Sequence, residues 1–179
     1  MKTNRISLCS TMSCGKTTLV NALSKLPEFQ GYKFQTERSK YLRDLGIPLN
    51  TDSTINGQIC FMAERSSELL NPKIITDRSI IDVMAFTEES KTMNRKEKNI
   101  LIESMSLLIP QYEHIFYIPH DGIKLEHNGI RCDDYEYRDK IDFTIRNLII
   151  KYKSIMKNLH TISGTTEERI ELVKQIVFL

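Results

Sequence analysis

The sequence predicts an α/β fold built on a parallel sheet, and three observations carry that prediction. Short apolar runs alternate with longer segments of helical periodicity, which is typical of strands that are each followed by a helix. No repeat, low-complexity tract or Pro/Gly-rich linker divides the chain. Its 179 residues suffice for one ordinary domain, which we expect to span residues 1–179 and to bury a single substantial core.

Five apolar runs are expected to form the strands. They comprise residues 5–9, 32–36, 72–76, 114–118 and 160–162. Pro119 is expected to end the fourth strand, because proline has no N–H to donate to a sheet ladder.

Segments of helical spacing separate these strands. The predicted helices run over about 16–26, a short segment ending near 46, 52–70, 80–88, 95–108, 133–159, and from 164–168 onward. Asp52 is expected to cap the third of them, and Thr165 with Glu168 has the spacing of a capping box at the start of the last.

A Walker A-like segment, Ser-Thr-Met-Ser-Cys-Gly-Lys-Thr, follows the first strand and leads directly into a helix. In this context its backbone N–H groups are expected to wrap a triphosphate, with Lys16 reaching the β- and γ-phosphates and the Thr17 hydroxyl binding Mg²⁺. The predicted nucleotide-binding residues here are Ser10, Thr11, Met12, Ser13, Cys14, Gly15, Lys16, Thr17 and Thr18. Ser10 stands where the motif has its first glycine, so we expect a working loop of slightly altered geometry. An ordinary Gly-Lys-Thr turn before a helix is the alternative.

Polar residues follow four of the five strands. These are the phosphate loop, Glu37-Arg38, Asp77-Arg78 and Ser163-Gly164. Ligands of open parallel sheets bind beyond the carboxyl ends of the strands, so these residues are expected to gather at one site.

The acidic and basic residues at these ends suit phosphoryl transfer. Asp77 is a candidate to hold Mg²⁺ or to orient an attacking hydroxyl, and Glu37 to accept the proton of that hydroxyl. Arg38 and Arg78 are candidates to bind an anionic acceptor, and Gln58 is a weaker candidate to contact an acceptor base. The alternatives are a helix cap for Asp77, solvated surface charge for Glu37 and Arg38, and a surface salt bridge for Arg78. The alternative for Gln58 is an exposed position on its helix.

Residues 120–138 are expected to form a closing lid that carries Arg131 and Arg138. Closure would exclude water and bring positive charge to the transferring phosphoryl group. Alternatively, Arg138 pairs along a helix with Asp134 and Asp142.

Composition limits the class of protein. With 40% hydrophobic and 27% charged residues the balance is that of a globular protein, and a net charge of +2 is too small to indicate nucleic-acid binding. No apolar run is long enough to span a bilayer, and the N-terminus lacks the apolar segment of a signal peptide, so we expect a cytoplasmic protein without membrane contact. The four cysteines show no C-x-x-C pair, and a homodimer is left open.

In order along the chain, these segments resemble a family of small AAA-like P-loop kinases of bacteria and their phages. The resemblance covers nearly the whole chain and is carried by the phosphate loop and by residues 36–38, 41–50, 77–83, 129–131 and 138–142. The family is similar to ribosylnicotinamide kinase domains and, more remotely, to thymidylate and deoxynucleoside kinases. The resemblance implies a five-stranded parallel sheet of order 2-3-1-4-5 flanked by helices, with an arginine-bearing lid. It also implies that Ser163, Gly164 and Thr165 lie beside the adenine of ATP.

The leading hypothesis is Mg²⁺-dependent transfer of the ATP γ-phosphoryl group to a nucleoside, nucleotide or related hydroxyl. One alternative is a kinase acting on a hydroxymethylated base in DNA, against which the near-neutral charge argues mildly. Another is a non-catalytic ATP-binding switch or assembly module, which would have no need of Glu37, Arg38 and a two-arginine lid.

Overall fold

A computed structural model describes residues 3–36, 38–120 and 135–178 of the chain. Its five strands form one parallel sheet in the order β2-β3-β1-β4-β5, so the predicted fold class and strand order are confirmed. The strands are β1 Asn4–Cys9, β2 Lys33–Gln35, β3 Lys73–Thr76, β4 His114–Tyr117 and β5 Leu159–Thr161. Each lies within or next to a run that the sequence predicted.

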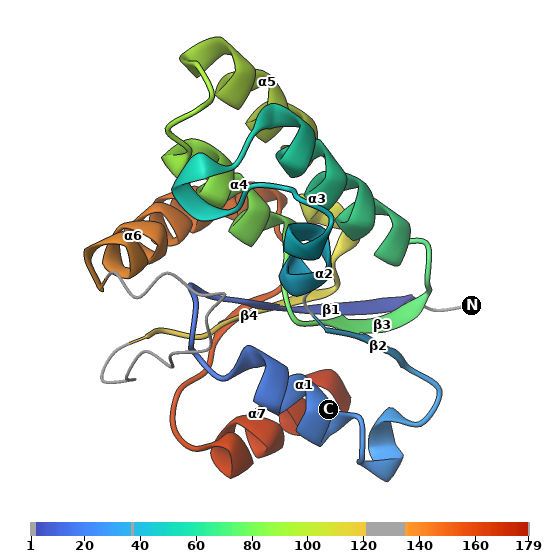
Figure 1. The fold of residues 1–179 in the computed structure, drawn as a ribbon. Helices are drawn as coiled ribbons and strands as arrows, with labels where there is room; N and C mark the ends of the chain where they lie inside the picture. Colours follow the sequence, from blue (N-terminus) through green and yellow to red (C-terminus); the bar gives the residue numbers. More distant parts are fainter. Residues whose placement is uncertain (1–2, 37, 121–134, 179) are drawn as a thin grey trace.

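Helices cover both faces of this sheet (Figure 1). The helices are α1 Lys16–Leu23, α2 Ser39–Asp44, α3 Ile55–Glu68, α4 Ile80–Glu89, α5 Arg95–Ser106, α6 Tyr135–Tyr152 and α7 Thr166–Phe178. The α1 and α7 helices lie on one face, and α3, α4, α5 and α6 lie on the other. Because both faces are covered, the central strand β1 is buried along Ile6–Cys9, where three of the four residues are apolar and Ser7 is the exception. None of the described helices combines the length and apolar character needed to cross a bilayer.

Two clusters of buried apolar side chains stabilise the two layers. One gathers side chains of α4, α5 and α6, including Met84, Met105 and Ile145. The other gathers side chains of α1, α7 and the opposite sheet face, including Leu19 and Val173. The loop that follows β1 belongs to both clusters, because Met12 packs in the first and Cys14 in the second.

Several helix boundaries differ from the sequence predictions; α1, for example, ends at Leu23 rather than near 26. Thr54, rather than Asp52, caps α3 by accepting a hydrogen bond from the Gly57 N–H at 3.3 Å, and Asp52 lies in the preceding 3-10 turn, Asn50–Asp52. The long helix α6 ends at Tyr152 rather than near 159, because residues 153–158 are used to bring the chain back alongside β4. The predicted capping box of the last helix is present, with Thr165 and Glu168 exchanging hydrogen bonds of 2.7 and 3.2 Å.

Candidate functional site

The loop between β1 and α1 has the backbone shape of a phosphate cradle. Ser13 (φ 59°) and Gly15 (φ 78°) have left-handed backbones, which turn successive N–H groups toward one centre. Ser10 has no positive φ, so this position does not require glycine and its serine adds no backbone strain.

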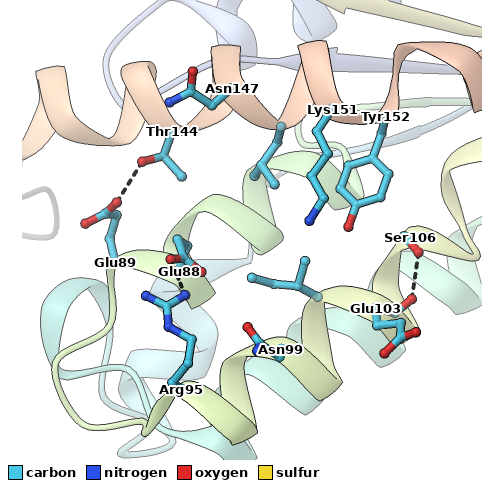
Figure 2. Close-up of a pocket in the computed structure, with 12 residues that line it drawn as sticks. Glu88, Glu89, Arg95, Asn99, Glu103, Ser106, Thr144, Asn147, Lys151 and Tyr152 are labelled. Atoms are coloured by element: carbon cyan, nitrogen blue, oxygen red, sulfur yellow. Dashed lines mark hydrogen bonds and ion pairs between the residues drawn. The ribbon is translucent and has the colours of Figure 1, made fainter.

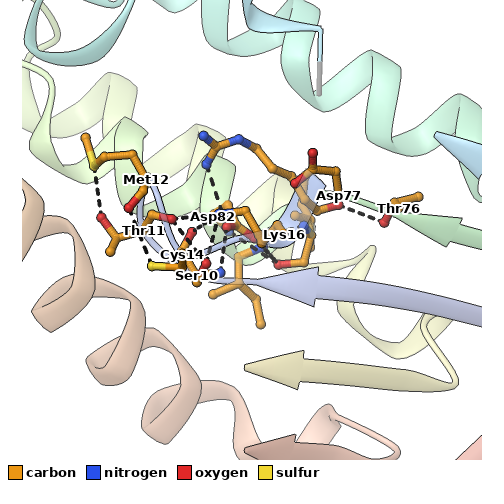
Figure 3. A network of polar contacts seen from close by, with 12 residues as sticks. Ser10, Thr11, Met12, Cys14, Lys16, Thr76, Asp77 and Asp82 are labelled. Atoms are coloured by element: carbon orange, nitrogen blue, oxygen red, sulfur yellow. Dashed lines mark hydrogen bonds and ion pairs between the residues drawn. The ribbon is translucent and has the colours of Figure 1, made fainter. Parts of the chain in front are cut away.

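Lys16 lies inside this loop (Figure 3). Its Nζ donates to the Ser10 carbonyl at 2.9 Å, to Ser10 Oγ at 2.9 Å and to the Thr11 carbonyl at 2.6 Å. The residue is 5% exposed, so its ammonium group is a buried positive charge at the centre of the loop. The Ser10 hydroxyl thus contributes a contact that glycine could not make.

Asp77 meets the phosphate loop from the neighbouring strand. It follows β3, which pairs with β1, and its Oδ2 accepts a hydrogen bond of 2.5 Å from Thr17 Oγ1 at the start of α1. Asp77 is 1% exposed, and its backbone N–H donates to the Gln35 carbonyl at 2.9 Å. The structure therefore brings together the two residues that the sequence predicted as metal ligands.

The side-chain oxygens of Thr17 and Asp77 are ligands of the type that a magnesium ion takes. Mg²⁺ takes oxygen ligands and is commonly held by one or two protein side chains together with waters and phosphate oxygens. A hydroxyl and a carboxylate whose oxygens lie 2.5 Å apart, beside a phosphate-shaped loop, supply that donor set.

Asp82 is a site residue that the sequence analysis did not single out. Its side chain is fully buried in the first turn of α4, where Oδ1 accepts from the Ser10 N–H at 3.0 Å. Its Oδ2 accepts from the Ser79 N–H at 2.8 Å and from Ser79 Oγ at 2.7 Å, completing a capping box. The Ser-x-x-Asp spacing before an apolar helix was the available signal for the cap. Nothing local indicated the contact with Ser10.

The acceptor-side candidates take different places. Arg78 lies beside the loop, with its guanidinium 3.8 Å from Asp82 and 5.1 Å from the centre of the Phe86 ring. Gln58 is 2% exposed and its Oε1 accepts from Thr87 Oγ1 at 3.3 Å, so it is a buried residue between α3 and α4 rather than an exposed helix glutamine.

Arg38 contacts a carboxylate of α3 and an aromatic ring of α2. Its side chain is 44% exposed, lies 3.6 Å from Glu64 of α3 and stacks 4.5 Å from the Tyr41 ring centre. The sequence analysis gave a solvated surface charge as the alternative for Arg38; the structure shows a partly exposed side chain paired with Glu64. Glu37 lies outside the described residues.

Arg138 is a buried neighbour of the phosphate loop. It lies in the first turns of α6 and is 2% exposed; its Nη2 donates to the His120 carbonyl at 3.5 Å and contacts Cys14 Sγ at 3.9 Å. Its own carbonyl accepts from Thr11 Oγ1 at 3.1 Å. The Asp142 carboxylate, the alternative partner, accepts from Tyr117 at 2.7 Å and from Arg146 of α6 at 2.7 Å.

The rest of the predicted lid, residues 121–134 with Arg131, lies outside the described residues. The lid therefore stays a prediction. What the structure adds is that its expected C-terminal arginine, Arg138, occupies a packed place in α6.

Arg169 of α7 is a second arginine beside the loop, and the sequence analysis missed it. Arg169 Nη1 donates to the Cys14 carbonyl at 2.8 Å, and burial lowers the pKa of this guanidinium. It follows the exposed segment Ser163–Thr165 after β5, in which Gly164 has φ 92° and a Cβ would lie 2.2 Å from Glu168 Oε2. The signal was weak: an arginine on the face of α7 that also carries the buried Val173.

Arg65 supports the Asp77–Arg78 turn from behind. It is 2% exposed, and its Nη1 donates to the Arg78 carbonyl at 3.2 Å, which also accepts from Thr76 Oγ1 at 2.8 Å. Its Nη2 donates to Glu68 Oε1 at 2.7 Å. Burial raises the pKa of the Glu68 carboxyl to about 7, and the nearby Arg65 charge only partly opposes this.

A groove of about 740 Å³ lies between α4, α5 and α6 (Figure 2). Charged and amide side chains line it, among them Glu88, Arg95, Asn99 and Lys151. None of the predicted site residues is among its lining residues. A smaller cavity of about 410 Å³ beside β2 is lined by Arg38, Glu64 and Glu68 among others.

Residues 5–169 of the chain match the family model described as an AAA domain. Among curated proteins, the apicoplast elongation factor Tu of Plasmodium falciparum (isolate 3D7) is 26% identical over 172 residues. This match takes in 90% of the chain and 39% of the elongation factor, so the chain spans well under half the length of that relative.

Three solved structures share the fold. Deoxyadenosine kinase from M. mycoides with bound dCTP has a TM-score of 0.66 at 17% identity, covering 96% of this chain and 97% of its own. The NadR protein in complex with NAD and AMP-PNP has a TM-score of 0.70 at 14% identity, covering 99% and 50%. Thymidylate kinase from Ehrlichia chaffeensis has a TM-score of 0.62 at 18% identity, covering 99% and 97%. These likenesses confirm the resemblance at the level of fold.

Proposed function

Because the chain belongs to the AAA domain family and joins a phosphate loop to a buried acid, we propose that it is an ATP-dependent phosphotransferase. It transfers the γ-phosphoryl group of ATP to a hydroxyl of a nucleoside, nucleotide or related acceptor. The observation that carries the proposal is the 2.5 Å contact between Thr17 of the loop and Asp77 of the adjacent strand. The similar folds of deoxyadenosine kinase and thymidylate kinase support the same class of reaction.

The donor nucleotide is bound by the loop and by cations from distant parts of the chain. Loop N–H groups bind the phosphate oxygens, and Lys16 Nζ exchanges its carbonyl partners for the β- and γ-phosphates. Arg138 and Arg169 already contact the loop at Cys14 and add positive charge beside it. Ser163–Thr165 is exposed after β5, where the adenine would lie.

Phosphoryl transfer demands positioning and charge neutralisation more than covalent chemistry. Thr17 and Asp77 would hold Mg²⁺, which when bound neutralises charge on the phosphate oxygens. Asp77 is buried and fixed by its backbone bond to Gln35, so it is also placed to orient the acceptor hydroxyl. Glu37 is the alternative base.

Residues of α3, α4 and the β3 turn would form the acceptor side. Arg78 is the candidate to bind an acceptor phosphate or sugar oxygen, because its guanidinium lies next to the loop. Gln58, already bonded to Thr87 in the interior, is the candidate to contact an acceptor base. Arg38, bound to Glu64, would need to leave that ion pair to reach an acceptor.

The test is a screen of acceptors with labelled ATP and Mg²⁺. The panel contains nucleosides, deoxynucleosides and their monophosphates, together with duplex DNA carrying hydroxymethylated bases, and the readout is labelled phosphate on the acceptor. Asp77→Asn should lower turnover by about 100-fold or more, as loss of a catalytic acid–base or charge-stabilising group does. Asp44→Asn is the matched control, because Asp44 lies at the exposed end of α2 with its side chain 56% exposed.

Each outcome assigns the chain to one class. Label on a free nucleoside or nucleotide supports the proposal, and label only on modified duplex points to a DNA-base kinase. ADP production that no acceptor stimulates, or ATP binding without turnover, contradicts the proposal and favours a nucleotide-dependent switch.

A further inference from the structure

We infer that Asp82 is a positioning residue that holds the phosphate loop at a set spacing from the Asp77–Arg78 turn. The inference rests on the proposed function for its catalytic consequence. The contacts that carry it are those of the Asp82 carboxylate with Ser10 and Ser79, which are independent of what the acceptor is.

The carboxylate fills a gap where two paired strands separate. The last paired residues of β1 and β3 are Ser7 and Thr76. Three residues further along each segment stand Ser10 and Ser79, and the backbone N–H of each donates to Asp82. Beyond Ser7 and Thr76 the sheet ladder no longer joins the two segments. A carboxylate accepts from both sides and joins the two chains in its place.

A neutral amide could not make the same link. Asp82 is fully buried and accepts three hydrogen bonds: one from Ser10 N at Oδ1, and two from the N and Oγ of Ser79 at Oδ2. The Arg78 guanidinium at 3.8 Å and the N-terminus of α4 both favour a negative charge at this place. In an asparagine the NH₂ group would face an N–H donor on one side. The asparagine oxygen would face Ser79, which supplies two donors, and the NH₂ group would face the Ser10 N–H. The hydrogen bond to Ser10 would therefore be lost.

The link connects the donor and acceptor halves of the site. On the loop side, Ser10 contacts both residues: its N–H donates to Asp82, and its carbonyl accepts from Lys16 Nζ. On the other side, Ser79 directly follows Asp77 and Arg78. Asp82 therefore fixes the distance between the residues that would grip the triphosphate and those that would face the acceptor. Misplacement of reacting groups by about 1 Å can cost about 100-fold in rate.

The decisive comparison is between two capping-box acids. Asp82 of α4 and Glu97 of α5 both occupy the third helical position and accept from the N–H of their cap residue. Only Asp82 uses its second oxygen on the phosphate loop. Asp82→Asn should lower turnover per folded molecule at least tenfold with a smaller change in ATP affinity. Glu97→Gln should change neither by more than twofold. Folded protein is counted by near-UV circular dichroism, and affinity is measured with a fluorescent ATP analogue.

A readout besides activity keeps the inference testable if no acceptor is found or if Asp82→Asn fails to fold. In the unaltered protein, the Ser10 amide should be strongly protected from hydrogen exchange and shifted downfield in ¹H–¹⁵N spectra, as expected for a donor to a buried carboxylate. Both properties should be lost in a folded Asp82→Asn variant and kept in Glu97→Gln. A Ser10 amide that exchanges at the solvent rate in the unaltered protein would overturn the inference. Equal turnover of Asp82→Asn and the unaltered enzyme would also overturn it, whereas absence of turnover in the unaltered protein would count against the proposed function alone.

Discussion

Replacing Glu68 by glutamine should change the way in which stability depends on pH. The Glu68 side chain is 9% exposed at the C-terminal end of α3, where it accepts a hydrogen bond from Arg65. Burial raises the pKa of its carboxyl from 4.5 to about 7, against the opposing effect of the Arg65 charge. The folded protein therefore holds this proton more tightly than the unfolded chain does. The stabilisation is fully present below pH 4.5 and is lost as the pH rises through about 7.

The size of this effect follows from the pKa values. Each unit of pKa corresponds to about 1.4 kcal/mol, so the rise from 4.5 to about 7 corresponds to about 3 kcal/mol. Glutamine does not titrate. The difference between the unfolding free energies at pH 5 and pH 8 should therefore be smaller in Glu68→Gln than in the unaltered protein, by about 2.5 kcal/mol, because pH 5 already lies above the unfolded pKa.

Urea unfolding at pH 5, 6, 7 and 8 measures this difference. Glu103→Gln is the matched control, because Glu103 is an exposed glutamate of α5, and its pH profile should run parallel to that of the unaltered protein. If the profiles of Glu68→Gln and the unaltered protein are parallel, the reasoning from burial is refuted.

Three further predictions concern the loop and the sheet edge. Ser10→Gly restores the usual motif but should lower the free energy of unfolding, measured in urea, by about 1 kcal/mol. The substitution removes the hydroxyl bonded to Lys16 and raises the conformational entropy of the unfolded chain. A gain in stability would contradict this. His160→Gln should reduce the loss of stability that occurs below pH 6.5. Burial lowers the pKa values of His160 and His114, whose ring nitrogens lie 3.2 Å apart, so the histidines take up protons on unfolding. Thermal unfolding at pH 5 and pH 7 measures this difference. Arg169→Met should weaken binding of a fluorescent ATP analogue about tenfold, because a charge-assisted hydrogen bond to the loop is lost; unchanged affinity would exclude that role.

The fold was predictable because its signals are local. A strand covered on both faces is mostly apolar, as in Ile6–Cys9 and Ile74–Thr76, where Ser7 and Thr76 are the polar exceptions. The intervening helices carry their apolar residues at helical spacing. The strand order came from the resemblance to the kinase family, and the sheet confirms it. Phosphate-loop chemistry is also local, since a strand, a loop and a helix follow one another in sequence.

Contacts between distant segments were not predictable in the same way. The bond from Asp82 to Ser10 depends on β1 and β3 being neighbours at a particular register, and 72 residues separate the two partners. Arg169 and the phosphate loop are 155 residues apart. Gln58 could be placed on a helix, but its burial against Thr87 depends on how α3 packs on α4. Periodicity assigns a residue to a face and leaves the partner of that face undetermined.

The packing of Met12 and Cys14 into opposite apolar layers has a thermodynamic consequence. Because Met12 packs in one apolar cluster and Cys14 in the other, the loop is held by both layers. Loosening of the loop is therefore coupled to unfolding of a whole layer. Ligand captured by the native protein, at about 100 times its dissociation constant, would add about 2.7 kcal/mol to the free energy of unfolding. That gain should be shared by the two layers, so that they melt together in a single cooperative step.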